Sequence, residues 1–199
     1  MSVLVTQPAP DFTAAAVMPD GSINEKFKLS DLRGKYVVLF FYPLDFTFVC
    51  PSEIIADDHR VSRFKELGVE VVGVSIDSQF SHFAWRETPV EKGGIGRVAF
   101  PLVADIKHEI TQAYGIEHPA GVALRGSFLI DKAGIVQAQI VNNLPLGREV
   151  DEMVRLVEAL QFTEEHGEVC PAGWRKGQKG MKPTADGVAA YLAENAGGL

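Results

Sequence analysis

The sequence has few of the features that mark a disulfide-stabilised, membrane-spanning or nucleic-acid-binding protein. Its 199 residues include only two cysteines, too few for a disulfide scaffold. No apolar stretch approaches the roughly 20 residues that a membrane-spanning helix needs. The net charge is −7, whereas nucleic-acid binding requires a basic footprint. We therefore expect a soluble protein that binds neither membranes nor nucleic acids.

The start of the chain also lacks a recognisable targeting signal. The first twenty residues contain no Lys or Arg, and Pro8, Pro10 and Asp11 interrupt any apolar core. We expect a cytoplasmic protein. In such a reducing compartment, thiols are more often catalytic or metal-binding than structural.

Motifs for metals and nucleotides are missing as well. The five histidines are scattered, and no pair has the spacing of a zinc site. His59 and His108 lie in polar helical contexts, where we expect solvated side chains. The segment Gly93–Gly96 is rich in glycine but matches no nucleotide-binding fingerprint. The sequence therefore predicts no metal site and no cofactor.

The patterns that are present indicate an α/β protein with a central mixed sheet flanked by helices. Short runs of β-formers alternate with amphipathic helical patterns. After Phe162 the composition shifts towards Gly, Pro and polar residues, which divides the chain into a domain of residues 1–162 and a mobile arm of residues 163–199. The expected strands are 11–17, 23–29, 36–42, 69–76, 98–103, 126–130 and 135–141, and the expected helices are 50–68, 78–87, 107–114, 148–161 and 185–196.

One stretch, from the strand 36–42 to the start of the next helix, carries the best candidate for chemistry. Pro43 ends the apolar run, as after a strand buried on both faces. Pro51 suits a first helical turn, so Cys50 lies at or next to a helix N-terminus. Free amides and the helix dipole there favour a thiolate, which is the nucleophilic form of cysteine. Position alone leaves a second interpretation open, in which Cys50 is a small buried hydrophobe.

The neighbouring residues favour the reactive cysteine. The string Pro43-Leu-Asp-Phe-Thr47-Phe-Val-Cys50 resembles the active-site signature of the peroxiredoxins, in which a proline and a threonine precede the peroxidatic cysteine at fixed spacing. The longer string FFYPLDFTFVCPSE, and Val169-Cys170-Pro171 followed by Trp174, are similar to two segments of the typical two-cysteine subfamily. The resemblance covers nearly the whole chain. It implies a thioredoxin-like fold with an added N-terminal hairpin and a C-terminal arm.

The same resemblance implies a thiol-specific peroxidase that reduces hydrogen peroxide and organic hydroperoxides, and it gives roles to several residues. The thiolate attacks the distal oxygen and becomes a sulfenic acid. Thr47 hydrogen-bonds the thiolate or the peroxide, and Arg125 supplies the cationic donor. Pro43 shields the site from water. Glu53 and Arg148 match positions that orient Thr47 or Arg125.

Cys170 matches the resolving cysteine of the subfamily. By resemblance it attacks the sulfenic acid on Cys50 of a partner subunit and forms an intersubunit disulfide. An external dithiol reductant, thioredoxin or a flavoprotein disulfide reductase, then returns both cysteines to the reduced state. The resemblance further implies a homodimer that assembles into a decameric ring.

Other classes of function compete with this one. A thiol–disulfide oxidoreductase on the same fold usually has a second cysteine three positions on, but the sequence reads Cys50-Pro51-Ser52-Glu53. A ring-forming holdase chaperone is a possible second role of the same assembly. A cysteine hydrolase is disfavoured, because no histidine lies in a recognisable partner motif.

The sequence departs from the family pattern in one respect. Members that are sensitive to over-oxidation carry a GGLG loop and a C-terminal Tyr-Phe pair, whereas this chain has Gly93-Gly94-Ile95-Gly96 and Tyr191-Leu192. A looser tail would let the start of the helix unfold faster, so that Cys170 reacts before a second peroxide does. We therefore expect intermediate or robust resistance to sulfinic acid formation.

Overall fold

The computed structural model describes residues 3–198 and consists of two compact units, one ending at Val150 and one beginning at Asp151. The predicted division of the chain after residue 162 stays a prediction. The helix expected to end at Gln161 is longer than predicted, because α4 (Val150–His166) continues without a break to Gly167. Gly167 has a positive φ of 65°, and its amide closes the last turn onto Thr163 O.

The first unit is built on a seven-stranded sheet with the order β2-β1-β5-β4-β3-β8-β9. Strand β3 pairs in parallel with β4 and antiparallel with β8, so the predicted mixed sheet is confirmed. The N-terminal hairpin is formed by β1 and β2, which pair antiparallel. The strands are β1 (Thr13–Val17), β2 (Ile23–Lys28), β3 (Tyr36–Phe41), β4 (Val69–Ser75), β5 (Leu102–Ala104), β8 (Arg125–Ile130) and β9 (Val136–Asn142).

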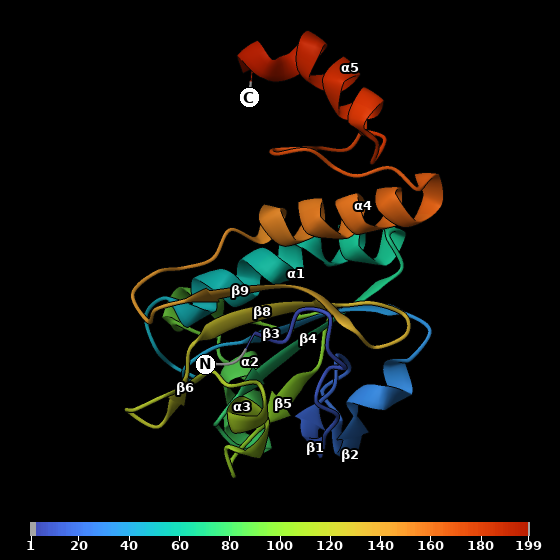
Figure 1. Cartoon of the computed structure of the whole chain (residues 1–199). Coiled ribbons are helices and arrows are strands. Elements are labelled where there is room, and N and C mark those ends of the chain that lie inside the picture. Colours follow the sequence, from blue (N-terminus) through green and yellow to red (C-terminus); the bar gives the residue numbers. More distant parts are fainter. Residues whose placement is uncertain (1–2, 199) are drawn as a thin grey trace. The chain divides into compact units, whose positions relative to one another are not determined.

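Strand β3 is buried along its whole length, as its apolar sequence predicts. On one face, Phe41 packs against Tyr114, beside the short helix α3 (Glu109–Ala113). On the other, Phe40 meets the edge of the Phe100 ring, on the side covered by α1 (Cys50–Glu66). Figure 1 shows α1 above β3 and β8, and α3 below them. Helices therefore cover both faces of the sheet.

The remaining elements of this unit are short. Helix α2 spans Gln79–Glu87, and a two-stranded hairpin that the sequence did not predict joins β6 (Glu117–His118) to β7 (Val122–Ala123). Two 3₁₀ helices are η1 (Leu29–Leu32) and η2 (Val90–Lys92). Within residues 3–198, none of the helices combines the length and the apolar character that crossing a bilayer would require.

Two local predictions for this unit are only partly confirmed. The strand expected over 98–103, with an interruption at Pro101, is formed only from Leu102 onward. Pro101 has no amide for the ladder and offers only its carbonyl, to Gly73 N. His59 is exposed, as expected, whereas His108 is only partly so: its side chain is 27% exposed and its ring lies 2.7 Å from the Glu117 carboxylate.

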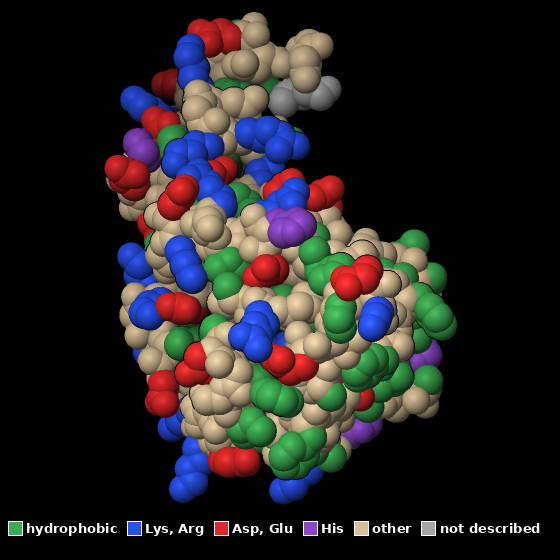
Figure 2. Space-filling model, turned by 180° about the vertical axis from the view of Figure 1, so that it is seen from behind, with side chains coloured by type: hydrophobic (Ala, Val, Ile, Leu, Met, Phe, Trp, Pro, Cys, Tyr) green, Lys and Arg blue, Asp and Glu red, His purple; other side chains and the backbone are tan. Residues whose placement is uncertain are grey.

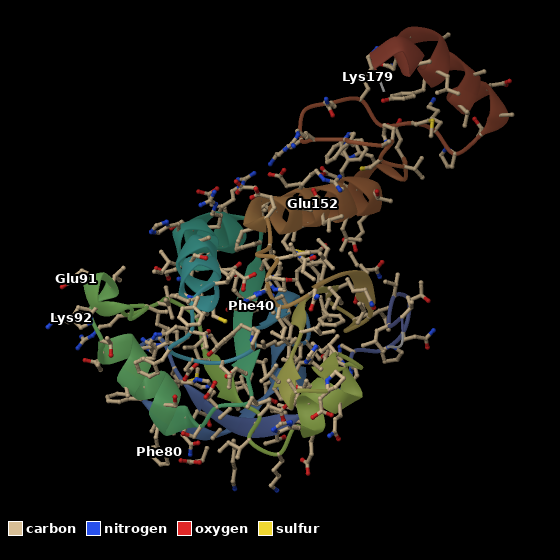
Figure 3. The ribbon with its side chains drawn as sticks, turned by 90° about the vertical axis from the view of Figure 1, so that its left-hand side faces the viewer. Phe40, Phe80, Glu91, Lys92, Glu152 and Lys179 are labelled. Carbon is tan, nitrogen blue, oxygen red and sulfur yellow. The ribbon has the colours of Figure 1, made fainter. Side chains whose placement is uncertain are left out.

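The aromatic residues of α2 divide into two groups. Trp85 is fully buried, whereas Phe80 and Phe83 are exposed. Figure 3 shows Phe80 projecting outward from α2 and Phe40 lying in the interior. Among these three rings, only Trp85 is therefore part of the core.

The second unit contains α4, an irregular segment, α5 (Ala185–Asn195) and the 3₁₀ helix η3 (Ala196–Gly198). The irregular segment is folded on itself, because Val169 and Met181 form an antiparallel bridge. Trp174 is 2% exposed and packs against the Phe162 ring of α4 at 4.8 Å. The segment after α4 is therefore anchored to its own helix by an aromatic contact.

Candidate active site

Cys50 is the first residue of α1, and its side chain is fully buried. The predicted position is confirmed, since Val49 is the N-cap residue and Pro51 lies in the first turn. The backbone amides of a first turn have no partner within the helix, and the helix dipole is positive at this end. The sulfur therefore sits where negative charge is stabilised.

Thr47 precedes Cys50 by three residues and contacts it directly. Its hydroxyl oxygen lies 3.0 Å from Cys50 Sγ and 2.8 Å from Leu44 O. A hydroxyl has a single proton to donate, so Thr47 serves either the sulfur or the carbonyl at one time.

Arg125, 75 residues later in the sequence, contacts the same sulfur. It is the first residue of β8, and its Nη1 lies 3.4 Å from Cys50 Sγ and 2.6 Å from Glu53 Oε2. Its Nε donates to Leu144 O at 2.7 Å, which fixes the plane of the guanidinium. The side chain is only 5% exposed, so its charge acts on the sulfur with little screening by solvent.

Glu53 and Arg148 complete a buried charge cluster around Arg125. Glu53 Oε1 accepts from both the backbone amide and Nε of Arg148, each at 2.9 Å. Arg148 Nη1 donates to Phe41 O and Gly126 O at 2.9 and 2.8 Å. Glu53 thus bridges two buried arginines. The cluster orients Arg125, whereas none of the described contacts links either residue to Thr47.

Pro43 is buried in the loop between β3 and α1, and a second polar network, which sequence reasoning missed, holds that loop. The Asp45 carboxylate accepts from the Tyr42 hydroxyl at 2.9 Å and lies 2.8 Å from Nδ1 of His82. The other ring nitrogen of His82 lies 3.2 Å from Val103 O. Both ring nitrogens therefore lie within hydrogen-bond distance of an oxygen.

The loop has an unusual backbone conformation at Phe46, and burial in its network raises the pKa of Tyr42. Phe46 follows Asp45 with a positive φ of 53°, a conformation that non-glycine residues rarely adopt. Burial, with the neighbouring Asp45 carboxylate, raises the pKa of Tyr42 well above its usual value. Tyr42 therefore stays a neutral hydrogen-bond donor to Asp45.

Asp57 is a second residue that sequence reasoning missed. It lies on α1 one turn beyond Glu53 and is 5% exposed. Burial raises the pKa of its carboxyl to about 7, against the lowering effect of Arg148. The signal was present in the sequence, because position 57 falls between Ile54 and Val61 on the buried stripe of the helix.

Cys170 belongs to the second unit, so the structure describes only its own surroundings. Its Sγ lies 3.5 Å from Ala159 O and 3.8 Å from the Thr163 hydroxyl, both on α4. Of the five predicted site residues, the structure brings Thr47, Cys50 and Arg125 together, and places Pro43 in the adjoining loop. The two cysteines are not joined by a disulfide.

The geometry of the first unit defines a class of protein before any comparison is made. A buried sulfur at a helix N-terminus, with a cation and a hydroxyl aimed at it, suits nucleophilic attack by a thiolate on an electrophile that releases negative charge. This is a thiol-dependent enzyme site on an α/β sheet. Among residues 3–198, there is no group of three or more His, Cys, Asp or Glu side chains placed to hold a metal ion.

Comparison with known proteins gives the family. Residues 5–139 match the AhpC/TSA family, and residues 159–194 match the C-terminal domain of 1-Cys peroxiredoxin. The chain is 60% identical over 194 residues to alkyl hydroperoxide reductase C of Helicobacter pylori, covering 97% of this chain and 98% of that protein. It is 53% identical over 191 residues to peroxiredoxin-1 of Gallus gallus, with 96% of each chain covered.

A solved structure agrees with these matches. The reduced 2-Cys peroxiredoxin of Plasmodium vivax has a TM-score of 0.94 at 49% identity, covering 96% of this chain and 100% of that one. The predicted thioredoxin-like fold is confirmed. The chain belongs to the AhpC/TSA family of peroxiredoxins and alkyl hydroperoxide reductases, and it is a peroxidase enzyme with an antioxidant role.

Proposed function

We propose that Cys50 is the peroxidatic residue and that it reduces hydrogen peroxide and organic hydroperoxides. The Cys50 thiolate attacks the distal oxygen of the peroxide. An S–O bond forms, the O–O bond breaks, and the departing hydroxide or alkoxide takes up a proton to leave as water or alcohol. Cys50 becomes a sulfenic acid, which is the first step of the cysteine oxidation ladder. The observation that carries this proposal is the convergence of Thr47 and Arg125 on Cys50 Sγ.

Arg125 and Thr47 have different roles in this step. Negative charge moves from the sulfur to the departing oxygen, and Arg125 Nη1 lies close enough to the sulfur to stabilise it throughout. Thr47 can change its hydrogen-bond acceptor from Leu44 O to the sulfur or the bound peroxide. Both groups hold the peroxide in line for attack. Pro43, buried beside them, limits access of water and of further oxidant to the sulfenic acid.

We further propose that Cys170 of a partner subunit resolves the sulfenic acid. Its thiolate attacks the Cys50 sulfur, an S–S bond forms, the S–O bond breaks, and the departing hydroxide takes up a proton to leave as water. Cys50 is fully buried as the first residue of α1, and bridged cysteines have Cα atoms about 4.4–6.8 Å apart. The first turn of α1 must therefore unwind before the disulfide can form. A dithiol reductant, thioredoxin or a flavoprotein disulfide reductase, reduces this disulfide and completes the cycle.

The assembly that this cycle needs is a homodimer, and we propose that dimers join into a decameric ring in the cytoplasm. Large hydrophobic side chains left exposed on the first unit support association between copies: Phe46, Phe48, Phe80, Phe83 and Ile106. Figure 2 shows several hydrophobic side chains at the surface in the lower part of the view. A holdase activity of such a ring stays a prediction, as does the expected resistance to sulfinic acid formation.

A single-turnover peroxide assay with matched variants tests the proposed role of the site. Pre-reduced protein should consume hydrogen peroxide rapidly, Cys50→Ser should not, and Cys170→Ser should complete only the first oxidation. Arg125→Gln should slow that oxidation about 100-fold, as for loss of one charge-stabilising donor. Arg97→Gln, which removes an exposed arginine, is the control and should match the wild type.

Two outcomes would contradict the proposal. Rapid peroxide consumption by Cys50→Ser would place the reactive group elsewhere. Reduction of insulin disulfides without added peroxide, by the wild type but not by Cys50→Ser, would instead favour the thiol–disulfide oxidoreductase. An unchanged rate in Arg125→Gln would leave the peroxidase in place but remove the proposed role of the arginine.

A further inference from the structure

Asp57 is a buried acid that the proposed reaction does not use. It lies on the side of α1 that also carries Cys50 and Glu53, seven and four residues earlier. An aspartate is rarely buried unless it is paired. Three charged side chains act on it: Arg148 from the segment before α4, and Glu53 and Arg60 from its own helix.

Arg148, whose charge acts on this carboxyl, carries one buried donor without a partner among the described residues. Its Nε and Nη1 are committed to Glu53 and to the backbone of β3 and β8. Within the described residues, its Nη2 is buried and has no hydrogen-bond partner. The guanidinium lies over the ring of Phe40, 5.3 Å from its centroid, and Figure 3 shows Phe40 in the interior. An unpaired buried donor of this kind favours a negative charge nearby.

The charges in the cluster are balanced without Asp57. Arg125 and Arg148 contribute two positive charges, and Glu53 and an ionised Cys50 contribute two negative charges. An ionised Asp57 would add a third negative charge to a site with little solvent. Burial places its pKa at about 7, so this charge appears in the physiological range.

We propose that Asp57 is a positioning residue of the peroxidase site. When Asp57 loses its proton, it attracts Arg148, and the cluster of Arg125, Arg148 and Glu53 then stabilises the reacting sulfur less. As the pH rises, Asp57 ionises and Arg148 Nη2 turns towards it. Arg148 then shares its charge between two carboxylates. Glu53 compensates by binding Arg125 more strongly, so Arg125 stabilises the reacting sulfur less. Peroxide reduction therefore slows. This inference rests on Cys50 being the residue that reacts with peroxide.

The pH profile of single-turnover Cys50 oxidation tests this proposal. The experiment uses the Cys170→Ser background, rapid quenching and mass spectrometry between pH 6 and pH 8.5. The rate constant should fall about three- to tenfold through a midpoint near 7, as expected for one added charge about two helical turns away. Asp57→Asn in the same background should hold its pH 6 rate throughout. Glu66→Gln, which removes an exposed carboxylate of α1, should follow the parent profile.

Parallel profiles in the parent and Asp57→Asn, whether both fall or both stay level, would overturn the proposal. Asp57→Leu gives a second neutral variant in case the asparagine disturbs packing. A level profile with either neutral side chain identifies the Asp57 charge as the cause, since a purely structural role would shift the rate equally at every pH.

A second measurement separates this proposal from the proposed function, because it needs no peroxide. Infrared difference spectroscopy follows the protonated carboxyl band that Asp57→Asn abolishes. Coupling is reciprocal, so removing the negative charge of Cys50 by Cys50→Ser should lower the midpoint of this band by about one pH unit. An unchanged midpoint would overturn the coupling. A shifted midpoint in a protein that fails to react with peroxide would refute the proposed function alone.

Discussion

At the scale of single residues, Asp57 also sets a pH dependence of stability. Its pKa is raised by burial from 3.8 to about 7 in the folded protein, whereas the unfolded chain has the ordinary value. At a pH between 3.8 and about 7, the Asp57 carboxyl keeps its proton in the folded state and has lost it in the unfolded state. The stability that this proton contributes is complete below about pH 4 and declines as the pH rises through about 7.

We therefore expect the stability of Asp57→Asn, relative to that of the wild type, to increase as the pH rises. The difference between their unfolding free energies should move by about 2 kcal/mol in favour of the variant between pH 5 and pH 8. Urea unfolding at fixed protein concentration measures it, with Glu66→Gln as the control that should run parallel to the wild type. A difference that does not change with pH would mean that Asp57 ionises normally.

The site residues differ in how far they can be predicted from the sequence. Thr47 and Cys50 are three residues apart, so local spacing and the helix start place them together. Arg125 lies 75 residues beyond Cys50, and only the family resemblance pointed to it. Glu53 binds both buried arginines with one carboxylate. This arrangement depends on strand pairing across the sheet, which no local sequence pattern encodes.

At the scale of elements, the loop between β3 and α1 depends on α2 for its shape. Asp45 is buried in this loop, and Nδ1 of His82 on α2 lies 2.8 Å from its carboxylate. The Asp45 amide also donates to Asp77, just before α2, at 2.8 Å. These contacts hold the loop that carries Pro43 and Thr47 against the sheet.

Removing His82 should therefore destabilise the protein strongly. His82→Phe leaves the Asp45 carboxylate buried with only the Tyr42 hydroxyl, and we expect a loss of about 3–5 kcal/mol in unfolding free energy. Adding Asp45→Asn to His82→Phe removes the unpaired charge and should restore part of the loss. Urea unfolding of both single variants and the double variant gives the coupling energy. A loss below about 1 kcal/mol in His82→Phe would show that the pair is not charged.

The ends of helices and strands that are set by a proline were predicted well from the sequence, and the end of α4 was predicted less well. Pro43 and Pro51 fix the end of β3 and the start of α1, because a proline cannot donate to a strand ladder or to an earlier turn. Pro101 was expected to interrupt the strand over 98–103, and β5 begins only after it, at Leu102. Helix α4 passes the expected end at Gln161 because Gly167 is the first residue that favours termination. The composition shift after Phe162 did not mark the end of the helix.

At the scale of the whole molecule, the two cysteines lie in different compact units of one chain. Each has its own surroundings: Cys50 is enclosed in the first unit, and Cys170 is held against α4 in the second by weak sulfur contacts. A segment anchored by Trp174 can release its cysteine without unfolding a core. The proposed cycle needs such a release in one subunit and unwinding of the first turn of α1 in the other.

The most direct test of the central claim, that Cys50 reacts with peroxide and Cys170 of a partner resolves it, is a non-reducing gel with peptide mass spectrometry. Pre-reduced protein is treated with one equivalent of hydrogen peroxide and then blocked with an alkylating agent. The account predicts a covalent dimer that contains a Cys50–Cys170 cross-linked peptide. A monomer with Cys50 oxidised and Cys170 alkylated would contradict the resolving step, and two fully alkylated cysteines would contradict the reaction of Cys50 itself.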